Sequence, residues 1–221
     1  MELGSHTSPA LAGGSRTLLI PLGATEQHGP HLPLDTDTRI AVAVAEGVAV
    51  RLADTVVAPA IAIGASGEHA GFPGTLSIGT KVLADVVIEI VRTAGPEFAR
   101  IVVVNGHGGN AYALRAAAAT CITEGRALDV WSMRLPGADA HAGRTETSLM
   151  LHLAPELVVA EAAEAGNTAP LGELLATMTD QGVRAVSANG VLGDPAGATA
   201  AEGATLLAEL VDDAVAQIGT R

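Results

Sequence analysis

Five side chains that can bind a metal ion or move a proton lie in one short segment, GATEQHGPHLPLDTDT. Glu26 and His28 are two positions apart, so both side chains point to the same face of an extended chain. Asp35 and Asp37 follow at the start of an expected helix. A carboxylate, an imidazole and a second carboxylate that converge on one point suit a divalent transition metal. An aspartate at a helix start also serves as an ordinary cap, so each residue alone has a structural explanation.

A second group of this kind is the segment NGHGGN, between a strongly apolar run and a helical one. His107 follows the expected strand directly. Gly108, Gly109 and Asn110 leave backbone N–H groups open at the helix start, which suits an anionic oxygen. The segment lacks the lysine of a phosphate-binding loop. An ordinary strand-to-helix turn with an incidental histidine is the alternative interpretation.

The third group is DAHAGRTETS, with His141 in a loop and Glu146 in the first turns of the next helix. Alone, Glu146 would only complement the helix dipole, and His141 would be a surface histidine. Together, the three groups supply enough ligands for two metal ions that share a carboxylate. Nucleophilic catalysis has weaker support, because Cys121 lies inside an expected helix and no serine lies in a GxSxG motif.

The elements that must position these groups alternate between short apolar runs and longer amphipathic ones. Strands are expected over 17–23, 55–60, 100–106 and 128–133, and helices over 37–53, 80–95, 110–125, 145–153 and 199–218. Thr80 is expected to cap one helix, and Thr199 with Glu202 forms a capping-box pattern. Strands that alternate with helices predict an α/β fold with a mostly parallel sheet, whose site lies at the strand ends.

Composition narrows the class of protein further. Of 221 residues, 48% are hydrophobic and 16% are charged, which is enough apolar material for a sizeable core. The net charge of −12 disfavours nucleic acid and anionic membranes as partners. A single cysteine forms no internal disulfide, and we see no secretory signal, so we expect a cytoplasmic protein. Residues 1–15 read as a flexible arm, and residues 16–221 as one catalytic domain.

Four segments carry a resemblance to a known family: PLGATEQHGPHLPLDTDT, GEHAGFPGTLSIGT, VVVNGHGGN and HAGRTETSLMLH. They closely resemble the creatininase family of metal-dependent amidohydrolases. The resemblance runs from about residue 17 to residue 153 and continues more weakly to the C-terminus. It implies a three-layer α/β/α sandwich with a mostly parallel central sheet.

The resemblance also implies two divalent ions, of zinc, iron or manganese. Glu26 and His107 would complete one site and His28 the other, while Asp37 would bridge both ions. His141 matches the family's catalytic histidine, a proton donor suited to this task because an imidazole titrates near neutral pH.

One position departs from the family pattern. Creatininase carries a metal-binding glutamate two residues after the NGH histidine, where this chain has Gly109. We expect Glu146 to replace it as a ligand and to take part in catalysis. His69, in the second matching segment, is grouped with Gly108, Gly109 and Asn110 as a candidate contact to substrate. The role of His31 stays open between an outer partner of the site and a surface group.

The substrate expected from the resemblance is a peptide. Creatininase encloses creatinine with tryptophans, whereas this chain has only Trp131 and an aromatic content of 2%. The late segments AGNTAPL and VSANGVLGDPAGATAAEG resemble a peptidase branch that acts near the C-terminus of a modified precursor peptide and releases a Val–Tyr-derived piece. Family members form rings, here a hexamer or octamer. The alternatives are hydrolysis of a cyclic amide or formamide, and a metal-stabilised scaffold without activity.

Overall fold

A four-stranded parallel sheet forms the centre of the molecule, in a computed structural model that describes residues 1–95 and 97–220. The strands are β1 (Thr17–Leu22), β2 (Thr55–Val57), β3 (Arg100–Asn105) and β4 (Asp129–Ser132), in the order β2-β1-β3-β4. The central pair is in register over its whole length, from Thr17 opposite Arg100 to Leu22 opposite Asn105.

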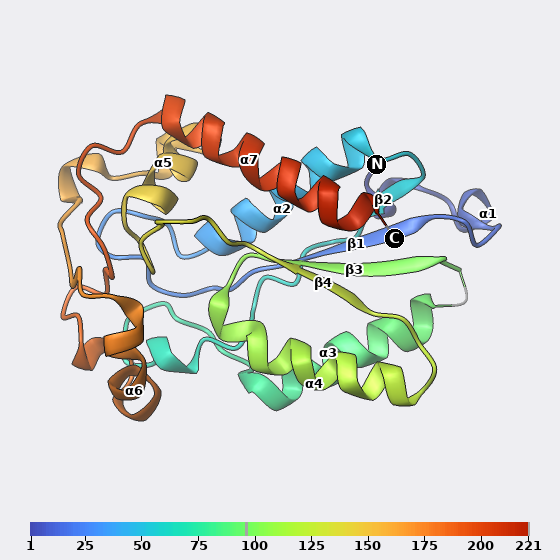
Figure 1. Cartoon of the computed structure of the whole chain (residues 1–221), viewed down its shortest axis with the longest axis horizontal. Helices are drawn as coiled ribbons and strands as arrows, with labels where there is room; N and C mark the ends of the chain where they lie inside the picture. Colours follow the sequence, from blue (N-terminus) through green and yellow to red (C-terminus); the bar gives the residue numbers. More distant parts are fainter. Residues whose placement is uncertain (96, 221) are drawn as a thin grey trace.

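Helices cover both faces of this sheet (Figure 1). On one face lie α2 (Thr36–Arg51), α5 (Arg144–Leu153) and α7 (Ala200–Gly219), and on the other lie α3 (Gly79–Ala94) and α4 (Ala111–Thr123). The three-layer α/β/α architecture expected from the sequence is therefore confirmed.

Alternation along the strands explains why both faces are covered. Leu18 and Ile20 of β1 pack in the core beneath α3 and α4, whereas Leu19 packs with α2 and α7. On β3, Ile101 packs beneath α3 and α4, whereas Val102 packs with α2 and α7. Because successive side chains of a strand point to opposite faces, apolar residues at every position require a layer on each side.

The single tryptophan belongs to the α7 side of this core. Trp131 on β4 is 2% exposed, and its Nε1–H donates to Asp213 Oδ2 of α7 at 2.8 Å. The indole therefore joins the last strand to the last helix, and it is part of the packing between layers.

Shorter elements complete the described chain. They are the helices α1 (Ser8–Leu11) and α6 (Leu171–Gln181) and the 3₁₀ turns η1 (Leu3–Ser5), η2 (Gly67–His69), η3 (Gly108–Asn110), η4 (Pro155–Leu157), η5 (Ala160–Ala162) and η6 (Val183–Ala185). At the N-terminus, Val57 N–H donates to Met1 O at 2.8 Å. The division into an arm and one domain stays a prediction. None of the described helices combines the length and apolar composition needed to cross a membrane.

The two predicted caps have different outcomes. Thr199 caps α7, since its hydroxyl accepts from Glu202 N–H at 3.1 Å. The Thr80 prediction is wrong, because α3 begins one residue earlier and Ser77 Oγ accepts from Gly79 N–H at 3.2 Å.

The central strands β1 and β3 mark the place where a ligand site belongs. After β1 the chain enters α2 on one face of the sheet, and after β3 it enters α4 on the other. The chain therefore diverges at the carboxyl ends of two adjacent strands, which is where ligand sites of open α/β sheets usually lie. Two of the three polar groups identified in the sequence follow these two strands directly.

Candidate metal centre

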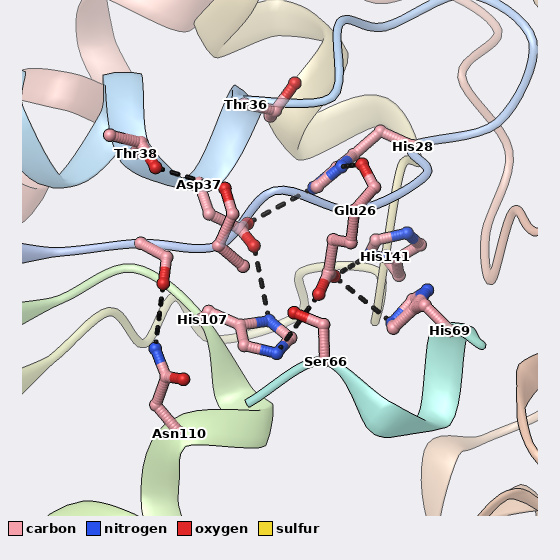
Figure 2. A network of polar contacts seen from close by, with 12 residues as sticks. Glu26, His28, Thr36, Asp37, Thr38, Ser66, His69, His107, Asn110 and His141 are labelled. Atoms are coloured by element: carbon pink, nitrogen blue, oxygen red, sulfur yellow. Dashed lines mark hydrogen bonds and ion pairs between the residues drawn. The ribbon is translucent and has the colours of Figure 1, made fainter. Parts of the chain in front are cut away.

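Most of the predicted ligands and catalytic groups meet at these strand ends (Figure 2). The residues are at most 9% exposed, although they come from four separate segments of the chain. The group consists of Glu26, His28, Asp37, His69, His107 and His141, which Figure 2 labels, together with Glu146 beside His28.

Asp37 lies at the middle of the cluster. Its Oδ1 is 3.2 Å from His28 Nε2, and its Oδ2 is 3.2 Å from His107 Nδ1. The first turn of α2 holds it there by packing directly on the ends of the central strands, where a Cβ at Gly23 or Gly106 would collide with the α2 backbone. One oxygen on each side is the arrangement that a bridging carboxylate requires.

Glu26 is fully buried beside three histidines. Its Oε1 is 3.1 Å from His69 Nε2 and its Oε2 is 3.2 Å from His107 Nε2. Neither contact has hydrogen-bond geometry. Asp37 Oδ2 likewise has no hydrogen-bond partner among the described residues. A buried carboxylate without well-formed partners is costly, so these atoms point to a missing cation.

The donor set fits a transition metal. Three groups of ligand atoms each lie within 4.8 Å of one another: Glu26 with His69 and His141, His28 with His141 and Glu146, and Glu26 with His28 and Asp37. Imidazole nitrogens with carboxylate oxygens suit zinc, manganese or iron. The described residues thus offer places for an ion on both sides of the cluster.

Burial and neighbouring charges favour the protonated forms of two predicted ligands, Glu26 and His28. Burial raises the pKa of Glu26 to about 8. Burial also opposes the charged form of His28, but the neighbouring Asp37 carboxylate outweighs it and raises the pKa of His28 to about 10. Because ligands must be deprotonated to bind a metal, an ion that enters this cluster displaces such protons.

Glu146 is held at the His28 side by an unusual turn. Ala142 has a φ of 51°, a left-handed conformation that alanine rarely adopts, and its N–H donates to Glu146 Oε2 at 2.6 Å. That oxygen lies 4.0 Å from His28 Nε2. The strained turn therefore aims a buried carboxylate at the cluster.

Asp139 weakens the alternative explanation that Glu146 only stabilises the start of α5. Its carboxylate accepts from the N–H groups of Arg144 and Thr145, so it satisfies the first turn of α5. Glu146 is therefore not needed to cap that helix.

We expect Glu146→Gln to lower the metal content from two ions per chain toward one and to reduce turnover severely, because an amide is a poorer ligand than a carboxylate. Elemental analysis and an amide-hydrolysis assay measure the two effects. Glu209→Gln, at an exposed site on α7, is the matched control. Two tightly held ions with normal turnover in Glu146→Gln would contradict the assignment.

His141 is fixed by the backbone on both sides. It pairs with Leu192 across an isolated bridge, and its ring lies 4.3 Å from that of His28 and 4.5 Å from that of His69. Burial and the charge of His28 hold the pKa of His141 well below its usual range. The sequence suggests an imidazole that titrates near neutral pH, whereas this surrounding disfavours the charged form of the ring.

The groups predicted to contact an oxyanion divide into two kinds. Asn110 Oδ1 accepts from Ala65 N–H at 2.9 Å, its Nδ2 donates to Gly23 O at 3.0 Å, and its own N–H donates to His107 O. Asn110 thus ties the ends of the central strands together. Gly108 and Gly109 lie beside the cluster in η3, and His69 lies within it.

Two other candidates lie outside the cluster. Asp35 pairs with Arg39 at 2.8 Å, on the outer side of α2. His31 is 1% exposed, and its Nε2 lies 2.8 Å from Thr147 Oγ1, so it anchors the loop to α5.

Sequence reasoning missed two side chains of the site. Glu68 Oε1 lies 3.4 Å from His107 Nε2 and fills the space that a Cβ at Gly109 would enter. Its position next to His69 in a matching segment was the available signal. Gln27 is buried against two of the histidines, although the alternation that pairs Glu26 with His28 places it on the opposite face.

Fold and site together are those of a three-layer α/β/α protein with a cluster of buried metal-ligand side chains at the ends of its central strands. A family model described as "Creatininase: Creatinine amidohydrolase" matches residues 2–218. The chain belongs to the creatininase family, and the enzyme class expected from the sequence, a metal-dependent hydrolase, is confirmed.

Individual relatives match nearly the whole chain. A mycofactocin precursor peptide peptidase of Mycolicibacterium smegmatis is 54% identical over 215 residues, which cover 95% of this chain and 87% of the relative. The corresponding peptidase of Mycobacterium ulcerans is 52% identical, covering 98% and 90%. Two solved structures, a creatininase described with Mn and a mutant creatininase of Zn-Zn type, each match with a TM-score of 0.81 at 26% identity, covering 98% of this chain and 96% of theirs.

Proposed function

We propose that this chain is a metal-dependent peptidase that hydrolyses an amide bond near the C-terminus of a modified mycofactocin precursor peptide and releases its Val–Tyr-derived fragment. The observation that carries the proposal is Asp37, which places one oxygen toward His28 and the other toward His107. The similarity to the peptidases of two mycobacterial species over nearly the full chain supports the choice of substrate.

Glu26, His28, Asp37, His107 and Glu146 would hold two divalent ions, and the names of the matched creatininases favour zinc or manganese. Such ions supply a polarised carbonyl and a water that ionises near neutral pH. Residues of the chain contact the developing oxyanion and transfer the proton. His69 and the N–H groups of Gly108 and Gly109 face the oxygen that gains negative charge.

His141 carries the proton between the two halves of the reaction. It takes up a proton from the attacking water and gives it to the departing nitrogen. Water thereby adds across the C–N bond, the bond breaks, and the products are a carboxylic acid and an amine, which at neutral pH become a carboxylate and an ammonium group.

Assembly and location belong to the same proposal. We propose a ring of six or eight copies in the cytoplasm. Exposed apolar side chains on the outer helices support the assembly, among them Val82 on α3, Ile122 on α4 and Leu175 on α6.

The position of Trp131 argues against creatinine as the substrate. The indole packs between β4 and α7, so it is not available to enclose a small ring at the metal cluster.

We therefore expect the metal-loaded protein to release a short C-terminal fragment from the matured precursor peptide, with little turnover of creatinine. Mass spectrometry of the products and a chelator-treated control measure this. Rapid creatinine hydrolysis without peptide cleavage would reverse the choice, whereas full activity in metal-free protein would exclude the mechanism. No hydrolysis of any amide after metal reconstitution would favour a scaffold.

A further inference from the structure

Gln27 lies between two proposed ligands, but its side chain turns away from both of them. It is 5% exposed, and its amide contacts His69, His141 and the backbone of Gly29 and Gly190. The proposed reaction gives this residue no role.

Backbone groups fix the orientation of the Gln27 amide. Its Oε1 accepts from Gly29 N–H at 2.9 Å, and its Nε2 donates to Gly190 O at 3.1 Å. A backbone N–H only donates and a carbonyl only accepts, so the oxygen and the nitrogen of the amide are assigned without ambiguity. One N–H of Gln27 Nε2 remains for a further acceptor.

His141 Nε2 lies 3.0 Å from Gln27 Nε2, but it also lies 2.7 Å from the Gln27 carbonyl, to which it donates, so it cannot accept. His69 is therefore the acceptor. Its Nδ1 lies 2.9 Å from Gln27 Nε2, so Nδ1 must hold a lone pair and the ring proton must sit on Nε2. His69 Nε2 lies 3.1 Å from Glu26 Oε1. His69 therefore presents an N–H donor to the cluster.

His141 turns its other ring nitrogen, Nδ1, toward the cluster. Its Nε2 lies 2.7 Å from the backbone carbonyl of Gln27, which requires an N–H at that nitrogen. Its Nδ1 lies 3.8 Å from Glu26 Oε1, so this nitrogen faces the cluster.

We propose that Gln27 is a positioning residue: its side chain fixes His69 as a hydrogen-bond donor toward the cluster, and its backbone carbonyl holds His141 Nε2 so that Nδ1 faces the same cluster. The use of these two orientations in catalysis rests on the proposed function, but the orientations themselves do not. Two histidines that present different ring nitrogens match a reaction in which one oxygen gains charge while one water loses a proton.

Gly190 lies directly against the Gln27 amide. Its φ of 83° favours glycine, and a Cβ there would collide with Gln27 Oε1. Gly190→Ala therefore disturbs the Gln27 amide without changing any residue of the metal cluster, and it provides a second, independent variant.

The test is the ¹⁵N NMR pattern of the histidine rings in zinc-loaded, histidine-labelled protein. In the wild type we expect both His69 and His141 to carry their proton on Nε2. Gln27→Met has a similar volume but no amide, so His69 should change to a mixture of tautomers. His141 should keep its pattern, because the carbonyl that holds it belongs to the backbone.

Activity provides the second measurement. We expect Gln27→Met and Gly190→Ala to lower kcat by about 100-fold, the order of loss for a misplaced catalytic group, with metal content unchanged. Gln217→Met, which removes a surface amide bonded to Asp213, is the control. A proton on Nδ1 of wild-type His69, or an unchanged His69 pattern in Gln27→Met, overturns the proposal. Because the spectra need no turnover, a failed peptidase assay would count against the proposed function alone.

Discussion

Replacing Asp37 by alanine is expected to release metal from the centre and to abolish hydrolysis. The reason is geometric, since Asp37 Oδ1 serves the His28 side and Oδ2 serves the His107 side. Loss of an outer partner of a metal ligand costs roughly 10- to 100-fold in metal affinity, and loss of a shared ligand should exceed that. Elemental analysis after dialysis and a chelator competition series measure the effect.

Asp35 offers a matched control for this experiment. It lies two residues away at the start of the same helix, but its carboxylate pairs with Arg39 outside the cluster. Asp35→Ala should keep its metal and its activity. Asp37→Asn tests whether a loss of folding explains the result, because the amide retains the shape of the side chain. Two ions in either Asp37 variant would show that another group bridges the sites.

Replacing His141 by alanine is expected to lower kcat by about 10²- to 10⁴-fold, the usual contribution of a group that transfers a proton. Metal content should stay near that of the wild type. The reason is that the cluster keeps its other ligands, whereas the departing nitrogen loses its proton donor. Steady-state kinetics on the precursor peptide and metal analysis of the same preparation test both statements.

The metal content of His141→Ala is a strict test of this role. The reason is that His141 belongs to two of the groups whose ligand atoms lie within 4.8 Å of one another, so the structure would also allow it to bind an ion. If His141→Ala loses an ion together with its activity, His141 is a ligand and its role is misassigned. His152→Ala, at an exposed position of α5, controls for the removal of an imidazole.

The sequence was sufficient for the layers of the fold because each strand and covering helix carries its own signal. The run RIVVVNG predicts a strand buried on both faces, and β3 occupies it to within one residue. Helix α6 was missed for the opposite reason. Leu171, Leu174, Leu175 and Met178 do follow helical spacing, but only Leu174 is buried, so this short stripe adds little to the core and was not recognised as a helix.

The candidate site was only partly predictable, for a physical reason. Ligand types at strand ends could be recognised from residue chemistry, and Glu26 with His28 share a face as the spacing suggests. Gln27 and Glu68 act through contacts with residues far away in the sequence, such as Gly190 and Gly109. No local pattern records such contacts, because they arise only when the chain has folded.

The solitary indole has a practical consequence for spectroscopy. Fluorescence excited at the red edge of tryptophan absorption comes from Trp131 alone, and this ring is hydrogen-bonded to Asp213 beneath α7. Its emission should shift to longer wavelength when α7 separates from the sheet and water reaches the indole. The protein thus carries an intrinsic optical reporter of one interlayer contact. Emission recorded during chelation would reveal whether the outer helix responds when the ions leave the carboxyl ends of the strands.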